Sequence, residues 1–227
     1  MPEPLLQVSD LTVEFSTPGG TIRALDSVSL EVFPGETVAV VGESGCGKTT
    51  MARVVLGLQN RVKGSVKFQG KEYVSSRDQG KHMGMVWQDP FASIDPRWTI
   101  KRVVSEPAVV AGTEIDVDKL LHDVGLPEAM ASRYPHQLSG GQRQRAAIGR
   151  ALALKPPLVI CDEPTAALDL SIQAQILNLL KDLQAELGCA YLYISHDLQT
   201  VRFLADRVAV MYMGQIVEYG KTEQVFG

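Results

Sequence analysis

A phosphate-binding loop is the clearest chemical pattern in this sequence. The pattern G-x-x-x-x-G-K-[ST] is matched by Gly42-Glu43-Ser44-Gly45-Cys46-Gly47-Lys48-Thr49. Glycines let backbone N–H groups point inward at phosphates, and a helix that follows the loop adds its positive N-terminal end. We expect Lys48 to bridge the β- and γ-phosphates of a nucleoside triphosphate and the Thr49 hydroxyl to bind Mg²⁺.

Two further residues of this region carry weaker signals. Cys46 occupies a free position of the pattern, where a small residue that fits is the simplest explanation. Thr50 directly follows the phosphate loop and is a further candidate nucleotide-binding residue. Its presence is also explained if it is simply part of the first turn of the helix.

Two adjacent carboxylates end an apolar run at residues 158–161. Asp162 and Glu163 should emerge at the carboxyl edge of a parallel sheet, where ligands of α/β proteins bind. Asp162 fits the role of holding Mg²⁺, and Glu163 could polarise an attacking water as general base. A solvated strand end with a helix-capping acid is the alternative. The phosphate loop in the same chain favours the catalytic interpretation.

Two other strand ends add candidates that are weak when taken alone. His196 follows the buried run 191–194, and the same edge geometry would bring it toward the γ-phosphate. A single histidine is more often a capping or core residue. Gln88 follows the run 83–87, and an amide at a strand end can orient water or contact Mg²⁺.

The elements that must position these residues can be predicted from hydrophobic patterning. Residues 6–15 and 28–32 alternate apolar and polar side chains and precede a turn at Pro34-Gly35-Glu36, which predicts an antiparallel N-terminal sheet. Residues 37–41 form a continuous β-branched and apolar run, typical of a strand covered on both faces of a parallel sheet. A helix should begin at Lys48. Similar runs and amphipathic stretches, such as residues 172–187, alternate later in the chain and predict a doubly wound α/β core.

Residues 90–154 have a different character and predict an inserted helical subdomain. Prolines at positions 96, 107, 127 and 135 should divide short helices there, among them residues 117–124 and 141–154. Residues 208–218 read as two strands around a glycine turn, followed by a short capped turn from Thr222. With no interdomain linker in sight, residues 1–227 are expected to form a single domain.

Composition limits the functional classes. The chain has 227 residues, 45% hydrophobic and 21% charged, with a net charge of −4. This balance argues against binding to nucleic acid, which needs a basic field. The three cysteines show no C-x-x-C pair, so neither a disulfide framework nor a zinc site is indicated. No apolar run approaches the roughly 20 residues that span a bilayer, and we expect a cytoplasmic protein.

At Leu138-Ser139-Gly140-Gly141-Gln142 the sequence resembles the signature of ABC ATPases. The phosphate loop, Gln88, the signature, Asp162-Glu163, Ala167-Leu168-Asp169 and His196 follow one another in the order of that family. The resemblance implies the ABC ATPase fold: a P-loop NTPase core with a parallel sheet, an N-terminal antiparallel β subdomain and an inserted α-helical subdomain. It also implies ATP and Mg²⁺ as ligands.

The resemblance further implies a shared site. In the family, ATP lies between two nucleotide-binding domains, so Ser139, Gly140, Gly141 and Gln142 should serve the ATP of a second domain, identical or paralogous. Phe15 matches the position of an aromatic residue that stacks on adenine, although packing of the N-terminal sheet would also explain it. Ala166 departs from the family, in which serine is common at that position.

Within the family, residues 87–97, 134–137 and 171–175 resemble the ATPases of oligopeptide, dipeptide and nickel importers. This resemblance implies a peripheral protein on the cytoplasmic face of the cell membrane. Its partners would be transmembrane permease subunits, with Gln88 and residues 89–100 as the docking region, and indirectly an extracytoplasmic solute-binding protein. Members usually continue past the point where this chain ends, so a domain or shortened form is expected. The alternative is an ATPase of a soluble, non-transport complex such as those of phosphonate breakdown.

Overall fold

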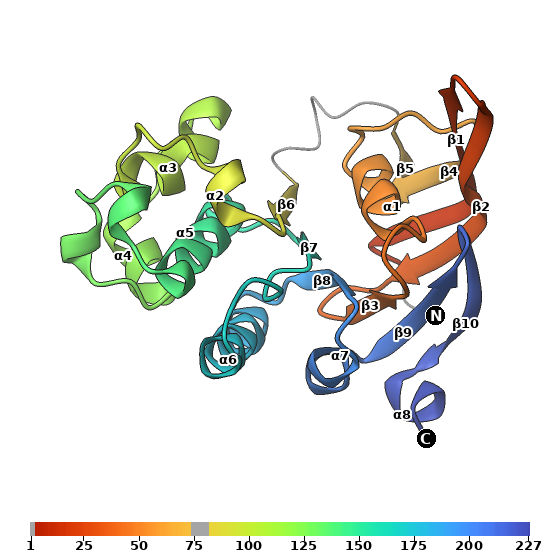
Figure 1. Cartoon of the computed structure of the whole chain (residues 1–227). Coiled ribbons are helices and arrows are strands. Elements are labelled where there is room, and N and C mark those ends of the chain that lie inside the picture. The colour runs from red at the N-terminus through yellow and green to blue at the C-terminus, as the bar shows by residue number, and fades with distance from the viewer. Residues whose placement is uncertain (1–2, 74–81) are drawn as a thin grey trace. The chain divides into compact units, whose positions relative to one another are not determined.

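In the computed structural model, which describes residues 3–73 and 82–227, the N-terminal residues form an antiparallel sheet (Figure 1). Strand β1 (Leu6–Thr17) pairs with β2 (Gly20–Val32) and with β4 (Lys63–Phe68), and β4 also pairs with β5 (Lys71–Glu72). Burial alternates at the start of β1, where Leu6 and Val8 are buried between less buried neighbours, and these pairings confirm the predicted sheet. The β1–β2 hairpin extends beyond the predicted strands, and its far end is exposed.

Parallel strands follow in the same part of the chain. Strand β3 (Thr37–Val41) lies between β8 (Ala190–Ser195) and β9 (Arg207–Tyr212), and both pairings are parallel. Every residue of β3 and β8 is buried, which explains why their sequences lack a polar face. Helix α1 (Lys48–Val55) follows β3, and α7 (Leu198–Leu204) follows β8. The predicted strand 37–41 and the helix start at Lys48 are confirmed.

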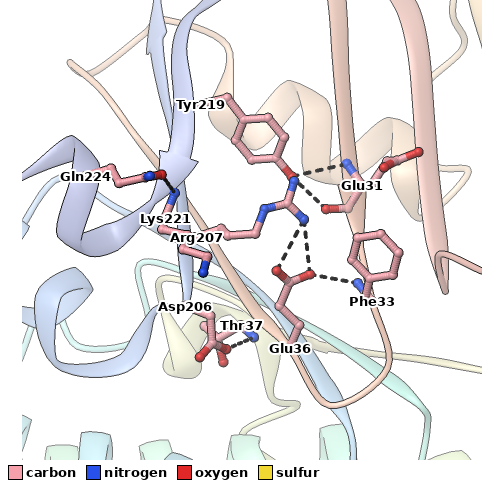
Figure 2. A network of polar contacts seen from close by, with 9 residues as sticks. All are labelled: Glu31, Phe33, Glu36, Thr37, Asp206, Arg207, Tyr219, Lys221 and Gln224. Carbon is pink, nitrogen blue, oxygen red and sulfur yellow. Dashed lines mark hydrogen bonds and ion pairs between the residues drawn. The ribbon is translucent and has the colours of Figure 1, made fainter. Parts of the chain in front are cut away.

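The C-terminal residues form the predicted hairpin. Strand β9 turns at Met213-Gly214 into the antiparallel strand β10 (Gln215–Lys221), and α8 (Thr222–Val225) follows. At the base of the hairpin, the Arg207 guanidinium forms an ion pair with Glu36 at 3.2 Å and lies 4.4 Å from the ring centroid of Tyr219 (Figure 2). The Tyr219 hydroxyl donates to the Glu31 carbonyl at 2.8 Å. This network ties β9 and β10 to β2 and to the turn before β3.

The chain divides into two compact units, Met1–Gln79 with Ala190–Gly227, and Gly80–Cys189. The elements described so far belong to the first unit. The second unit contains the parallel pair β6 (Met83–Val86) and β7 (Leu158–Asp162). Its helices are α2 (Pro90–Ser93), α3 (Ile100–Ala111), α4 (Val117–Asp123), α5 (Gly140–Leu152) and α6 (Leu170–Leu187), with short 3₁₀ turns at Glu128–Met130 and Pro135–Gln137. Helix α5 packs against the other α-helices of this unit and against β6.

The prediction that Pro107 divides two helices is wrong, because α3 continues through it. Proline removes one intrahelical hydrogen bond. Helix α3 nevertheless buries Ile100, Val103, Val104 and Ala108 along one face, begins at a Thr99 cap and ends at Gly112. Packing of this face outweighs the local preference. Within the described residues, the structure contains no helix whose length and apolarity would suffice to cross a membrane.

Candidate nucleotide-binding site

The loop Gly42–Gly47 connects β3 to α1 and has the backbone that the glycine pattern predicts. Gly42, Gly45 and Gly47 have φ values of 156°, 81° and 113°, which favour glycine. Space is also limiting, since a Cβ on Gly42 would lie 2.2 Å from the Met211 carbonyl oxygen, and one on Gly47 would lie 2.6 Å from that of Ala24. Two of the glycines are therefore required both by conformation and by close neighbours.

Lys48 is buried inside this loop, with 5% of its surface exposed. Its Nζ donates to the carbonyl oxygens of Gly42 and Glu43, both at 2.8 Å, and lies 3.9 Å from the Cys46 sulfur. The loop therefore holds an ammonium group at its centre, where it faces dipoles but no carboxylate partner within ion-pair distance among the described residues.

The rest of the loop also fits a phosphate group. Glu43, Ser44 and Gly45 are exposed, whereas Cys46 and Gly47 are buried. Thr49 and Thr50 are half-buried at the start of α1. Among the residues that the structure describes, no side chain caps the N-terminus of α1 at Gly47. An uncapped helix end after a glycine loop favours anions, because its amides and its dipole both point at the ligand.

His196 leaves the same sheet edge as the loop. Strands β3 and β8 are parallel with Val41 opposite Ser195, so Gly42 and His196 are the next residues of two adjacent strands. His196 is exposed, and the following residue, Asp197, caps α7 by accepting a hydrogen bond from the Gln199 amide at 2.8 Å. This register places His196 at the same sheet edge as the phosphate loop, as its position after the strand predicted. Its contact with the γ-phosphate stays a prediction.

The second unit brings Gln88 and Glu163 together. Strands β6 and β7 are parallel with Val86 opposite Cys161, and two residues farther on the Gln88 amide nitrogen donates to Glu163 Oε2 at 3.2 Å. Asp162, the last residue of β7, is buried with 4% exposed, whereas Glu163 is half-buried. Glu163 has a φ of 47°, a strained conformation for a non-glycine residue of the kind that concentrates at functional sites.

The signature residues start helix α5. This helix begins at Gly140, one residue earlier than predicted, with Ser139 as its cap. The Ser139 hydroxyl accepts from the Gln142 amide at 3.3 Å, and Gln142 Oε1 accepts from the Ser139 amide at 2.9 Å. A Cβ on Gly141 would lie 2.6 Å from Ile172 Cγ2. Ser139, Gln142 and Gly141 therefore each have a structural role that the sequence interpretation did not include.

Phe15 lies on β1 opposite Ile22 of β2, near the exposed end of the hairpin. Its exposed fraction is 37% and that of Ile22 is 57%, so this aromatic ring is not enclosed by the sheet. The exposure leaves a face of Phe15 accessible, and its stacking on adenine stays a prediction.

The candidate residues fall into the two units. The first unit holds the phosphate loop, Phe15 and His196, and the second holds Gln88, Asp162, Glu163 and the signature. Sequence reasoning missed the contribution of β9 and β10, where Met211 and Gly214 touch the loop. The glycine at position 214 indicated a turn, but no signal along the chain indicated what that turn contacts.

A buried parallel strand, a glycine loop and an enclosed lysine at a helix start define a P-loop nucleotide-binding protein. The ABC transporter family model matches residues 25–166, and the chain belongs to this family. The predicted family and the predicted ABC ATPase fold are thereby confirmed, and so is the prediction of an ATP-binding subunit.

Several relatives carry names that describe transport. The chain is 43% identical to the oligopeptide transport ATP-binding protein OppF of Bacillus subtilis, over 100% of this chain and 78% of the relative. It is 46% identical to the glutathione import ATP-binding protein GsiA of Pectobacterium atrosepticum, over 99% of this chain and 39% of that longer protein.

Solved structures agree with the fold. The ATP-binding cassette MJ0796, described as a dimer in a post-hydrolysis state bound to ADP and Pi, matches with a TM-score of 0.86 and 29% identity. The match covers 96% of this chain and 98% of that one. CbiO1 from Clostridium perfringens, part of the ABC transporter complex cbiONQ, matches with a TM-score of 0.87 and 29% identity, over 99% and 91% of the two chains.

Proposed function

We infer that this chain hydrolyses ATP to energise an ABC importer that takes up peptides or a similar small solute. The import of peptides rests on the relatives, which are named for oligopeptide transport and glutathione import. The names support a solute class and no particular solute.

The observation that carries the ATP part of this proposal is the enclosed lysine. A buried ammonium group loses its hydration, so it requires hydrogen bonds and opposite charge nearby. Lys48 has two carbonyl acceptors at 2.8 Å. A triphosphate in the loop would add the missing negative charge, and the loop amides and the start of α1 would bind its oxygens.

Hydrolysis then requires an activated water. Glu163 would act as the general base, with its carboxylate held at one oxygen by the Gln88 amide at 3.2 Å. His196 would contact the γ-phosphate. Thr49 and Asp162, with the Gln88 amide oxygen, would hold Mg²⁺, which neutralises charge on the phosphates when bound.

A second copy or a paralogous domain would complete the site. Ser139 and the amides of Gly140 and Gly141 lie at the start of α5, where hydroxyl, amides and dipole suit a phosphate of the opposite domain. The likeness to a cassette that is described as a dimer supports this arrangement. Two sites would form across a twofold axis.

Residues 89–100 offer a docking surface for transmembrane permease subunits, which a solute-binding protein would contact in turn. The Arg150 guanidinium on α5 donates to the Ser93 carbonyl at 2.7 Å, so this segment is held against α5, and the same guanidinium pairs with Glu106 on α3. A cavity of about 200 Å³ beside it is lined in part by Ile94 and Trp98. A permease segment in this cavity would place the chain at the cytoplasmic face of the membrane.

Substitution of Glu163 by glutamine tests the catalytic part. Glu163→Gln keeps the side-chain shape but removes the base, so turnover should fall about 10²- to 10⁴-fold. ATP affinity and ATP-dependent dimerisation should persist, as measured by calorimetry and size-exclusion chromatography. Glu186→Gln, an exposed change on α6, is the control and should keep wild-type turnover. Glu163→Gln turnover within about threefold of wild type would reject the general base role.

Copurification tests the transport part. The natively expressed chain should be recovered from detergent extracts with a polytopic membrane protein. Recovery with soluble enzyme subunits alone would reject the importer and favour a soluble complex.

A further inference from the structure

The C-terminal hairpin forms one wall of the phosphate loop. Strand β9 runs parallel to β3 with Val210 opposite Val41, so Met211 comes level with Gly42. The Met211 carbonyl oxygen lies only 2.2 Å from the position that a Cβ on Gly42 would take. The Met211 sulfur lies 3.4 Å from the position of a Cβ on Gly47. Backbone and side chain of one β9 residue therefore touch both ends of the loop.

The tip of the hairpin, Met213-Gly214, is hydrogen-bonded directly to the loop near the end that leads into α1. The Gly214 amide donates to the Cys46 carbonyl at 3.0 Å, and the Gly214 carbonyl accepts from the Asp26 amide at 2.8 Å. The Gln215 side chain also donates to the Asp26 carboxylate at 2.8 Å. The tip is thus fixed between β2 and the loop.

The turn at this tip is strained. Met213 and Gly214 have φ values of 45° and 80°, as a two-residue hairpin turn requires. Methionine is unfavourable at such a φ, and its side chain gains little by burial, since 76% of Met213 is exposed. Surrounding contacts must hold the turn, and the bonds of Gly214 to Cys46 and Asp26 provide them.

The base of the same hairpin is anchored as well. Figure 2 shows Arg207 between Glu36 and the ring of Tyr219, and the Asp206 carboxylate accepts from the Thr37 amide at 2.8 Å. Thr37 is the first residue of β3, which leads into the loop. Strand β9 is therefore attached to β3 at its beginning and to the loop at its end.

We propose that the Met213-Gly214 tip is a positioning element for the phosphate loop and that it sets the affinity for ATP. Displacement of the tip would release the Cys46 carbonyl and let the loop leave the conformation that receives phosphates. Bound ATP would restore this conformation, so the Michaelis constant should rise while kcat stays near that of the wild type. The ATP part of this proposal rests on the proposed function, whereas the loop part does not.

Gly214→Ala tests the proposal. Its Cβ would lie 2.8 Å from the Ala24 carbonyl oxygen, so the tip must move. The control is Gly220→Ala in β10, whose Cβ would have its nearest neighbours at an ordinary 3.6 Å. Alkylation of Cys46, located by mass spectrometry, reports on the loop without nucleotide. Cys161 and Cys189 are 0% and 2% exposed, and burial raises the pKa of the Cys161 thiol, so both should stay unreactive.

For Gly214→Ala we expect Cys46 alkylation about tenfold faster and a Michaelis constant about tenfold higher, with kcat within about twofold, the changes that ~1.4 kcal/mol produces. Gly220→Ala should match wild type in all three. Unchanged Cys46 alkylation and Michaelis constant in Gly214→Ala, or equal effects in both variants, would overturn the proposal.

Two further results remain interpretable. If Gly214→Ala does not fold, Gln215→Ala removes only the side-chain bond to Asp26 and should shift both readouts in the same direction by about twofold to threefold. No shift in Gln215→Ala would then overturn the proposal. If wild type binds no ATP but Gly214→Ala still accelerates Cys46 alkylation, positioning of the loop is supported and the proposed ATPase function fails.

Discussion

Replacing Gly141 by alanine tests whether close packing or helix propensity has the larger effect on stability at the start of α5. An alanine Cβ there would lie 2.6 Å from Ile172 Cγ2 on α6, whereas carbon atoms prefer separations of about 3.5–4.0 Å. Overpacking of this kind costs ~1–3 kcal/mol, and replacing glycine by alanine in a helix gains at most ~1 kcal/mol. We therefore expect Gly141→Ala to lower the free energy of unfolding by ~1 kcal/mol.

A second substitution should reverse the sign of this effect. Ile172→Ala removes the methyl group that the new Cβ would meet, so the gain in helix propensity is no longer opposed. In the Ile172→Ala background, Gly141→Ala should raise the free energy of unfolding by up to ~1 kcal/mol. The double-mutant cycle should give a coupling energy of at least ~1 kcal/mol, in the range seen for residues in contact.

Urea unfolding, followed by tryptophan fluorescence and circular dichroism, measures these free energies, and an unchanged m-value supports their comparison. Gly140→Ala is the neighbouring control, because its Cβ would lie 3.4 Å from the end of the Leu168 side chain, an ordinary contact. This control should not be destabilised. If Gly141→Ala is more stable than wild type, or if the cycle gives no coupling, the packing argument is refuted.

Three further predictions concern single side chains. Lys48→Met should weaken ATP binding about 10- to 100-fold, since bonds to a charged donor contribute ~1.5–3 kcal/mol; unchanged affinity by calorimetry would contradict the role of Lys48. Phe15→Ala should weaken ATP binding by ~1–3 kcal/mol if the ring stacks on adenine, and equal affinity would leave only a packing role. Hydrogen bonds from Arg97 lower the pKa of Asp95 from 3.8 to about 2, so this interaction stabilises the fold above about pH 4 and is lost as the pH falls through about 2. NMR titration giving a pKa near 3.8 for Asp95 would refute that interaction.

The signature residues illustrate two demands on one sequence. Ser139 and Gln142 form a reciprocal cap at the start of α5, a pattern that stabilises helices in proteins of any function. The same hydroxyl is proposed to bind phosphate in a second domain. Substitution of Ser139 alone would therefore combine a capping loss with a binding loss, and stability must be measured beside activity.

The types and spacing of residues close together in the sequence determined the strands and loops whose conformation depends on local preferences. The run at 37–41 predicted a buried strand because it has no polar face, and the glycine spacing after it predicted the loop because left-handed φ values favour glycine. The order of the remaining motifs predicted the family and its fold. Pro107 shows the limit of this approach, since a local rule predicted a break where the packed face of α3 holds the helix together.

Which residues from distant parts of the sequence contact one another was decided only by the tertiary structure. The Gly214 amide meets the Cys46 carbonyl, far away in the sequence, because β9 pairs with β3, and Ile172 meets Gly141 because α6 packs on α5. No pattern within one segment encodes such a meeting, since it depends on strand register and helix packing that arise when remote apolar faces are buried together. The sequence alone therefore determined which residues could bind a nucleotide, and the fold decided which other residues hold them in place.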